Sequence, residues 1–253
     1  MNFRNTVRRS TLAALALVLS GGASLQAQDL PDAKDLLARY REAIGGTAAM
    51  ADKQSVHSVG EFSVPAAGLV AQFEAYSARP NRSATKVPIP GFGEFLRGFT
   101  GDVAWSVDPM EGPRLLQGPE LAEARDEAAF ESSLRPDELV ESVTTVERTT
   151  LAGRECYKVR VAWKSGRETF DCFSPESGLL VGSMSKQHSA MGVVDAVALY
   201  DEYRDFGGVR MASRITVQIL GNEQVVMLRE VRFNEVPDSA FEPPTEIRAL
   251  IRQ

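Results

Sequence analysis

The sequence contains few of the side chains that usually perform catalysis or hold a metal ion, with 2 histidines and 2 cysteines among 253 residues. No HExxH, GxSxG or P-loop pattern is present, and the two cysteines do not form a CxxC pair. His57 lies in an alternating run and His188 in a polar stretch, as is typical of structural or solvent-facing histidines. These absences predict a protein that is not an enzyme and that uses neither a cofactor nor a metal.

Long apolar runs are also missing: beyond the first thirty residues, none is long enough to cross a bilayer as a helix. At the N-terminus, three arginines precede a short apolar stretch over residues 11–19, and small and polar residues follow up to Ala27. This pattern is typical of a cleaved secretory signal peptide. The sequence therefore predicts a signal peptide over residues 1–27, one mature domain over residues 28–253, and a periplasmic location.

Positive charge is scarce in the predicted mature chain. Three of the 28 basic residues and none of the 34 acidic residues lie within residues 1–27, so 25 basic residues remain against 34 acidic ones. This excess of negative charge argues against nucleic acid or an anionic membrane surface as the main partner.

The hydrophobic pattern predicts helices at the start and in the middle of the mature chain, with strands elsewhere. Residues 31–44 have helical spacing with Asp29 as a cap, residues 47–53 form a short second helix, and residues 119–132 form the middle one. About eleven alternating runs with short turns lie between residues 56 and 233. This order predicts a mainly β protein with helices (α+β), built on a single strongly curved antiparallel sheet.

The two cysteines lie on the two arms of one predicted hairpin. A three-residue loop at residues 164–166 sets Cys156 opposite Ser174 rather than opposite Cys172. The cysteines are then diagonal neighbours, and a disulfide would need some backbone shift. An oxidising compartment favours pairing, so the sequence leaves both a disulfide and two free thiols open.

Three motifs in register carry a resemblance to a known family. They are "ARPNR" (residues 78–82), "FTGDVAWSVDP" (residues 99–109) and "FNEVPDSAFEPPTEI" (residues 233–247). In order and spacing they resemble the LolA-type family of periplasmic lipoprotein carriers, which have Arg-Pro-Asn, Asp-Gly-Lys-x-x-Trp and Phe-x-Phe-x-Pro-Pro at these places. This chain departs from the family in having Gly-Asp instead of Asp-Gly in the second motif, and in an insertion over residues 109–121.

The resemblance implies an unclosed barrel of about eleven strands with a helical lid over an apolar cavity. Taken by themselves, the apolar strand faces favour a packed core over a cavity. The implied function is a monomeric periplasmic carrier that holds the acyl chains of a lipoprotein or lipid, with an inner-membrane donor and an outer-membrane acceptor as partners. The alternative is a lipid- or lipoprotein-sensing module that acts through a protein partner.

Candidate site residues lie on the strands around the Arg-Pro turn. Phe73, Phe95, Phe99 and Trp105 are expected to line the cavity, because they cluster there in the sequence. Arg79 aligns with the conserved arginine of the resembling family, which implies that it bonds to lid-side backbone and clamps the lid. The proline that follows fixes the local backbone and so orients this arginine.

Overall fold

The computed structural model describes residues 30–189 and 192–252. The predicted signal peptide lies outside the described residues. Within them, none of the helices is both long and apolar enough to cross a membrane.

One antiparallel sheet contains all thirteen strands of the described residues, in the order β6-β5-β4-β3-β2-β1-β13-β12-β11-β10-β9-β8-β7. The strands, in chain order, are β1 (Ser55–Val64), β2 (Leu69–Ala78), β3 (Arg82–Ile89), β4 (Gly93–Phe99), β5 (Ala104–Asp108), β6 (Gly112–Leu115), β7 (Val140–Leu151), β8 (Arg154–Trp163), β9 (Glu168–Phe173), β10 (Leu180–Ser189), β11 (Gly192–Phe206), β12 (Val209–Ile219) and β13 (Asn222–Phe233).

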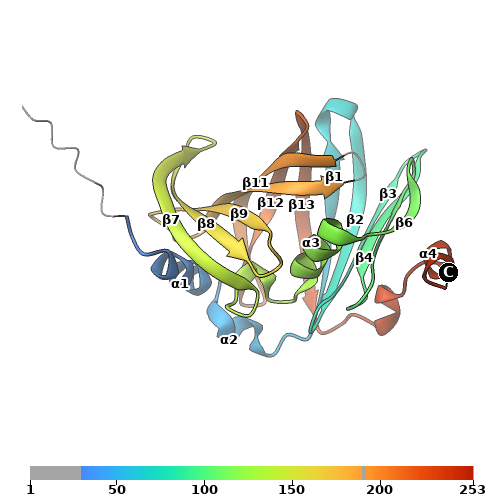
Figure 1. Cartoon of the computed structure of the whole chain (residues 1–253), viewed down its shortest axis with the longest axis horizontal. Helices are drawn as coiled ribbons and strands as arrows, with labels where there is room; N and C mark the ends of the chain where they lie inside the picture. Colours follow the sequence, from blue (N-terminus) through green and yellow to red (C-terminus); the bar gives the residue numbers. More distant parts are fainter. Residues whose placement is uncertain (1–29, 190–191, 253) are drawn as a thin grey trace, which may run out of the picture.

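The sheet curves strongly into a half-barrel and does not close (Figure 1). Two runs of sequential hairpins, β1 to β6 and β7 to β13, are joined where β1 pairs with β13, and β6 and β7 form the free edges. The predicted fold class is therefore confirmed, with thirteen strands against about eleven expected. Part of the difference is the four-residue strand β6, which lies in the segment read from the sequence as an insertion.

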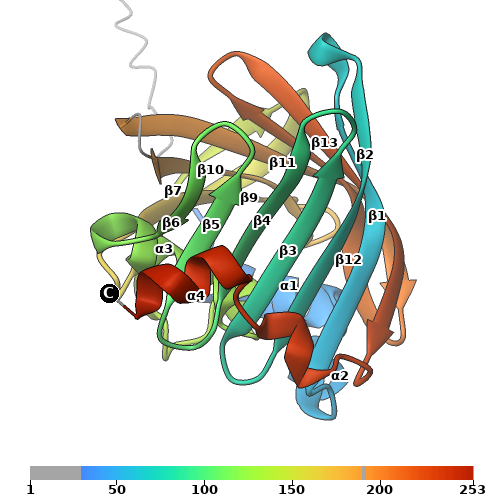
Figure 2. The same ribbon diagram turned by 90° about the vertical axis from the view of Figure 1, so that its right-hand side faces the viewer.

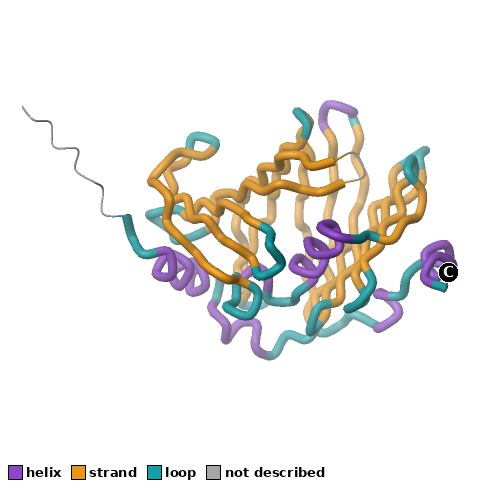
Figure 3. Tube along the Cα trace, in the orientation of Figure 1, coloured by secondary structure: helices purple, strands orange, loops and turns teal. Residues whose placement is uncertain are grey.

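Three helices lie on the concave side of the sheet: α1 (Ala33–Ala43), α2 (Gly46–Ala51) and α3 (Gly118–Ala128) (Figure 3). The N-cap of α1 is Asp32, whose side chain accepts a hydrogen bond of 2.7 Å from the backbone N–H of Lys34, so the predicted Asp29 cap is corrected. The apolar stripe of α1 buries Leu36 and Tyr40 against the sheet. Helix α3 belongs to the connection between the two edge strands, and it lies across the open side of the half-barrel.

A fourth helix, α4 (Thr245–Ile251), packs on the convex side against β5 and β6 (Figure 2). The sequence analysis placed helices at the start and in the middle of the chain and so missed α4, which has only seven residues. Ile247 of α4 is fully buried. The sheet is thus covered by helices on both faces, and residues of one strand can be buried on opposite sides of it.

Candidate functional site

A cavity of about 500 Å³ lies between the concave face of the sheet and the helices. Most of its wall is apolar. The end of α1 and helix α2 contribute Ile44 and Met50, and strands β1, β2 and β13 contribute Val56, Phe73 and Phe233. Ligand sites for small molecules typically have volumes of about 300–1,000 Å³ and mostly apolar walls.

A buried ion pair lies beside this apolar wall. Arg135, which lines the cavity, donates from Nε to the Asp171 Oδ2 atom at 2.8 Å and from Nη1 to the carbonyl oxygen of Ser133 at 2.6 Å. Asp171, on β9, is fully buried between Val159 of the neighbouring strand and the helices. Burial by itself would lower the pKa of Arg135, but the charge and hydrogen bond of Asp171, together with the nearby tyrosines Tyr40 and Tyr200, raise this pKa overall. Arg135 therefore carries its positive charge.

Three tyrosines line the same cavity. Burial raises the pKa of Tyr40, raises the pKa of Tyr200 to about 12, and raises the pKa of Tyr203 still further. Tyr203 donates its hydroxyl to the carbonyl oxygen of Leu180 at 3.0 Å. All three phenols thus keep their protons at neutral pH and remain hydrogen-bond donors.

Arg79 fastens helix α2 to the sheet. Its guanidinium donates to the carbonyl oxygens of Lys53 at 2.9 Å and Met50 at 3.1 Å, which lie at the C-terminal end of α2. The same side chain pairs with Glu131 and lies over the ring of Phe130, 4.7 Å from its centroid. Cationic groups are favourable at the C-terminal end of a helix, where carbonyl groups lack partners. Arg79 therefore ties the end of β2 both to α2 and to the segment that follows α3.

A second arginine connects the concave-side elements to one another. Arg41 of α1 donates to the carbonyl oxygens of Leu134 at 2.8 Å and Arg135 at 2.6 Å. The turn that carries the buried Arg135 is therefore anchored to α1 through its backbone.

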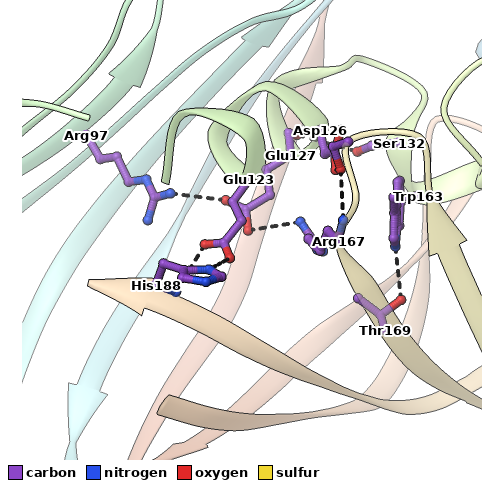
Figure 4. Close-up of polar contacts among 10 residues, drawn as sticks. Arg97, Glu123, Asp126, Glu127, Ser132, Trp163, Arg167, Thr169 and His188 are labelled. Atoms are coloured by element: carbon purple, nitrogen blue, oxygen red, sulfur yellow. Dashed lines mark hydrogen bonds and ion pairs between the residues drawn. The ribbon is translucent and has the colours of Figure 1, made fainter. Parts of the chain in front are cut away.

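Helix α3 is connected to both halves of the sheet by charged side chains (Figure 4). Glu127 contacts Arg97 of β4 at 3.4 Å and Arg167, in the β8–β9 turn, at 3.6 Å. Glu123 contacts the ring Nδ1 atom of His188, on β10, at 2.5 Å. These contacts bridge the open side of the half-barrel, so α3 forms one wall of the cavity, with its residue Asp126 on the lining.

The four predicted cavity residues lie in four different environments. Phe73 lines the cavity. Phe95 packs in the cluster around Phe73 and Val87 without belonging to the lining, and Phe99 is buried against α3. Trp105, which was expected to line the cavity, does not belong to its lining; it pairs with Gly98 across the β4–β5 hairpin.

The face that Trp105 occupies follows from the register of that hairpin. Phe99 pairs with Ala104, and both pack against α3 on the concave side. Since successive side chains of a strand point to opposite faces, Trp105 lies on the convex side, where a Cβ atom added at Gly98 would come within 2.5 Å of the indole ring. The glycine leaves room for the indole, so Trp105 is a packing residue of the outer face.

The cysteines have the predicted hairpin register. Trp163 and Arg167 close the turn through a hydrogen bond of 2.9 Å, and Lys158 pairs with Cys172, which places Cys156 diagonally from it. Both cysteines are buried free thiols in the structure.

The sequence analysis did not identify the polar cavity residues Arg135, Tyr40 and Tyr200, nor Asp171, which pairs with Arg135. Arg135 and Asp171 lie 36 residues apart in no recognisable motif. A signal was nevertheless available: in the predicted hairpin register Asp171 lies opposite Val159, on a face that also carries Val161 and Trp163, so it is a carboxylate among apolar side chains.

The architecture defined by these features is an open β half-barrel whose concave side holds helices around an apolar cavity. Solved structures of the same fold include a LolA superfamily protein from Nitrosomonas europaea (14% identity, 85% of this chain and 99% of that one, TM-score 0.54). A DUF1329 family protein from Desulfovibrio piger matches with 14% identity over 84% of this chain and 98% of that one, with a TM-score of 0.55. An outer membrane lipoprotein-sorting protein domain from Vibrio parahaemolyticus matches with 11% identity over 88% of this chain and 100% of that one, with a TM-score of 0.52.

These similarities establish the LolA-like fold predicted from the sequence motifs. No protein-family model and no curated protein sequence matches the chain. The function therefore has to be argued from the cavity.

Proposed function

We propose that this protein is a carrier that holds acyl chains of a lipoprotein or lipid in its cavity, in the periplasm, and passes them towards the outer membrane. The observation that carries the proposal is the apolar cavity of about 500 Å³ between the concave face and the helices. Two of the solved structures with this fold are a LolA superfamily protein and an outer membrane lipoprotein-sorting protein domain, which supports the same reading.

The attachment of the helices supports a carrier that opens. Helix α2 has only six residues, and Arg79 contacts the carbonyl groups at its C-terminal end. A short helix held by a few polar contacts can move away from the sheet at modest cost, whereas the sheet itself is continuously hydrogen-bonded. Loading and release then require movement of the helices, with the half-barrel as a rigid frame.

Direct binding of an uncharged apolar probe tests the proposal. N-phenyl-1-naphthylamine should bind to the purified mature protein with increased fluorescence, and long-chain acyl compounds should displace it. Phe73→Ser, which places a hydroxyl in the cavity wall, should weaken binding, whereas Val70→Ser, on an exposed site of the same strand, should not. A folded protein that binds no apolar probe would contradict the proposed function.

A further inference from the structure

The Arg135–Asp171 ion pair is unusual because of where it lies. Arg135 directly follows a 3-10 turn over Ser132–Leu134, and its backbone has a positive φ of 49°. Arg135 is only 9% exposed and lines the cavity. Its partner Asp171 is fully buried. A positive φ in a residue with a Cβ atom costs free energy, and such residues are concentrated at functional sites.

Stability alone does not explain the pair. Removing two charges from water costs several kcal/mol, and well-packed apolar residues in place of a buried ion pair are often neutral or stabilising. Asp171 lies on the face of the sheet that carries Val159 and Phe173, where an apolar side chain would fit the surroundings. A buried ionised group beside an apolar cavity is instead expected where a ligand needs a polar partner.

The arginine has donors beyond those used by its protein partners. A guanidinium carries five N–H groups. Among the described residues, Asp171 takes the one on Nε and the carbonyl oxygen of Ser133 takes one on Nη1, while the guanidinium carbon lies 5.7 Å from the centroid of the Tyr40 ring. Tyr200 lines the same cavity and adds a protonated hydroxyl to its wall. The site therefore offers hydrogen-bond donors to an oxygen atom of a ligand.

The charges around the cavity indicate which kind of oxygen fits. The lining contains Arg135, Arg167 and Arg210 and two carboxylates, Asp126 and Glu127. When the carboxylate of Asp171, which pairs with Arg135, is included, the positive charges of the arginines equal the negative charges of the carboxylates in number. A free carboxylate or phosphate would bring an unbalanced charge into a partly desolvated site, which is costly. A neutral carbonyl oxygen accepts the same hydrogen bonds without that cost.

From these observations we propose that Arg135 and Tyr200 form a polar anchor for the carbonyl group of an acyl ester or amide, inside the apolar cavity. The inference rests on the proposed carrier function and makes its cargo class more specific. The ligand is an esterified or amide-linked acyl chain, as in an acylated glycerol or an acylated amine, and free fatty acids are discriminated against.

Three ligands of one chain length test this anchor by displacement of N-phenyl-1-naphthylamine at pH 8. Methyl laurate has the carbonyl group, dodecyl methyl ether lacks it, and laurate is an anion. The wild-type protein should bind the ester about tenfold more tightly than the ether, which corresponds to about 1.4 kcal/mol, and more tightly than laurate. Tighter binding of laurate than of the ester would overturn the proposal.

The double variant Arg135→Met/Asp171→Leu removes both charges together, so that neither is left unpaired. The ratio of ester to ether affinity should fall to about one. The matched control is Arg114→Met/Glu120→Leu, which removes a bidentate ion pair at 2.7 and 2.8 Å that lies outside the cavity lining, and its ratio should equal that of the wild type. A ratio that persists in the Arg135 double variant would contradict the anchor.

A second variant covers the case in which the double variant does not fold. Tyr200→Phe deletes one hydroxyl and retains the ring, and it should lower the ester-to-ether ratio about threefold. An unchanged ratio in Tyr200→Phe, together with a double variant that cannot fold, would also count against the proposal. Failure of the underlying carrier function looks different, because then neither the probe nor any of the three ligands binds to the wild-type protein.

Discussion

The Nε atom of Arg79 donates a hydrogen bond of 2.9 Å to the carbonyl oxygen of Lys53, which connects the end of strand β2 to the segment that leaves helix α2. The same guanidinium also reaches Met50 within α2. One side chain thus donates to two carbonyl groups in and just after the last turn of α2, where the Met50 carbonyl oxygen also accepts from the backbone N–H of Lys53 at 3.2 Å. Arg79 shares the attachment of this segment with Asn234, which accepts from the backbone N–H of Gln54 at 2.6 Å and donates to the carbonyl oxygen of Asp52 at 3.1 Å.

Arg79→Leu should loosen α2 without unfolding the sheet. The substitution removes charge-assisted hydrogen bonds, each contributing about 1.5–3 kcal/mol, and the pairing with Glu131. We expect faster amide hydrogen exchange over residues 46–54 and faster probe association in stopped-flow fluorescence. Arg79→Lys should be intermediate, because an ammonium group cannot reproduce the planar fork.

Arg82→Leu is the control for this prediction. Arg82 also lies over an aromatic ring, that of Phe241, and pairs with Asp238 at 2.9 Å, but both partners belong to the C-terminal segment. Its loss should leave exchange over α2 unchanged. Equal effects of the two leucine variants on α2 would show that Arg79 is not a specific clamp.

Trp105→Ala and Phe73→Ala should separate stability from binding. Trp105 is 4% exposed on the convex side, so its truncation should lower the free energy of unfolding by about 3–5 kcal/mol while probe affinity is retained. Phe73 is part of the cavity wall, so Phe73→Ala should weaken probe binding as well. Denaturant titration and probe fluorescence measure the two effects, and weaker binding in folded Trp105→Ala would place the ligand elsewhere.

Asp126 is expected to make the protein less stable as the pH rises. Burial raises the pKa of this carboxyl group, although Ser165 donates a hydrogen bond of 2.5 Å to it and Arg167 lies nearby. A raised pKa means that the folded state binds the proton more tightly than the unfolded state does. The stabilising contribution is therefore present below the ordinary pKa of aspartate and is lost as the pH rises through the raised one.

Asp126→Asn should remove this dependence. We expect its Tm at pH 7 to exceed that of the wild type by on the order of 1–2 °C, because the hydrogen bond from Ser165 and the charge of Arg167 offset much of the effect of burial. The difference should shrink towards pH 4, and Glu176→Gln, at an exposed position, should show no such trend. A Tm below that of the wild type at pH 7 would mean that the contacts of the Asp126 carboxylate outweigh its burial.

Cys156 and Cys172 should be found as two free thiols. They lie diagonally across the β8–β9 hairpin, and burial raises the pKa of both. Thiol titration in denaturant without reductant should therefore count two groups per chain, and the native protein should react slowly with thiol reagents at pH 8. A count of zero would instead establish the disulfide.

The features that could be predicted from the sequence are those that short stretches of residues determine: the strands and the register of one hairpin. Alternation identified the strands, and the three-residue loop after Trp163 gave the hairpin register that the structure has. The motif around Arg79 led to a residue that does contact the end of a helix on the concave side.

The features that the sequence did not predict depend on tertiary contacts, above all on which side of the sheet each helix covers. The register of the β4–β5 hairpin, which alternation within each strand does not give, places Phe99 and Trp105 on opposite faces. The short helix α4, which covers the outer face, has no strong periodic signal. The Arg135–Asp171 pair depends on a tertiary contact between a turn and a strand, which no local pattern encodes.

The pairing of β1 with β13 has a consequence for how the chain folds. The first strand has two neighbours, β2, which follows it at once, and β13, which is the last strand to be synthesised or translocated. Until that last strand arrives, β1 presents an unpaired edge, a template for wrong partners. Contacts between such distant segments make folding slow, so the nascent half-barrel should be most vulnerable to aggregation shortly before its final hairpin emerges.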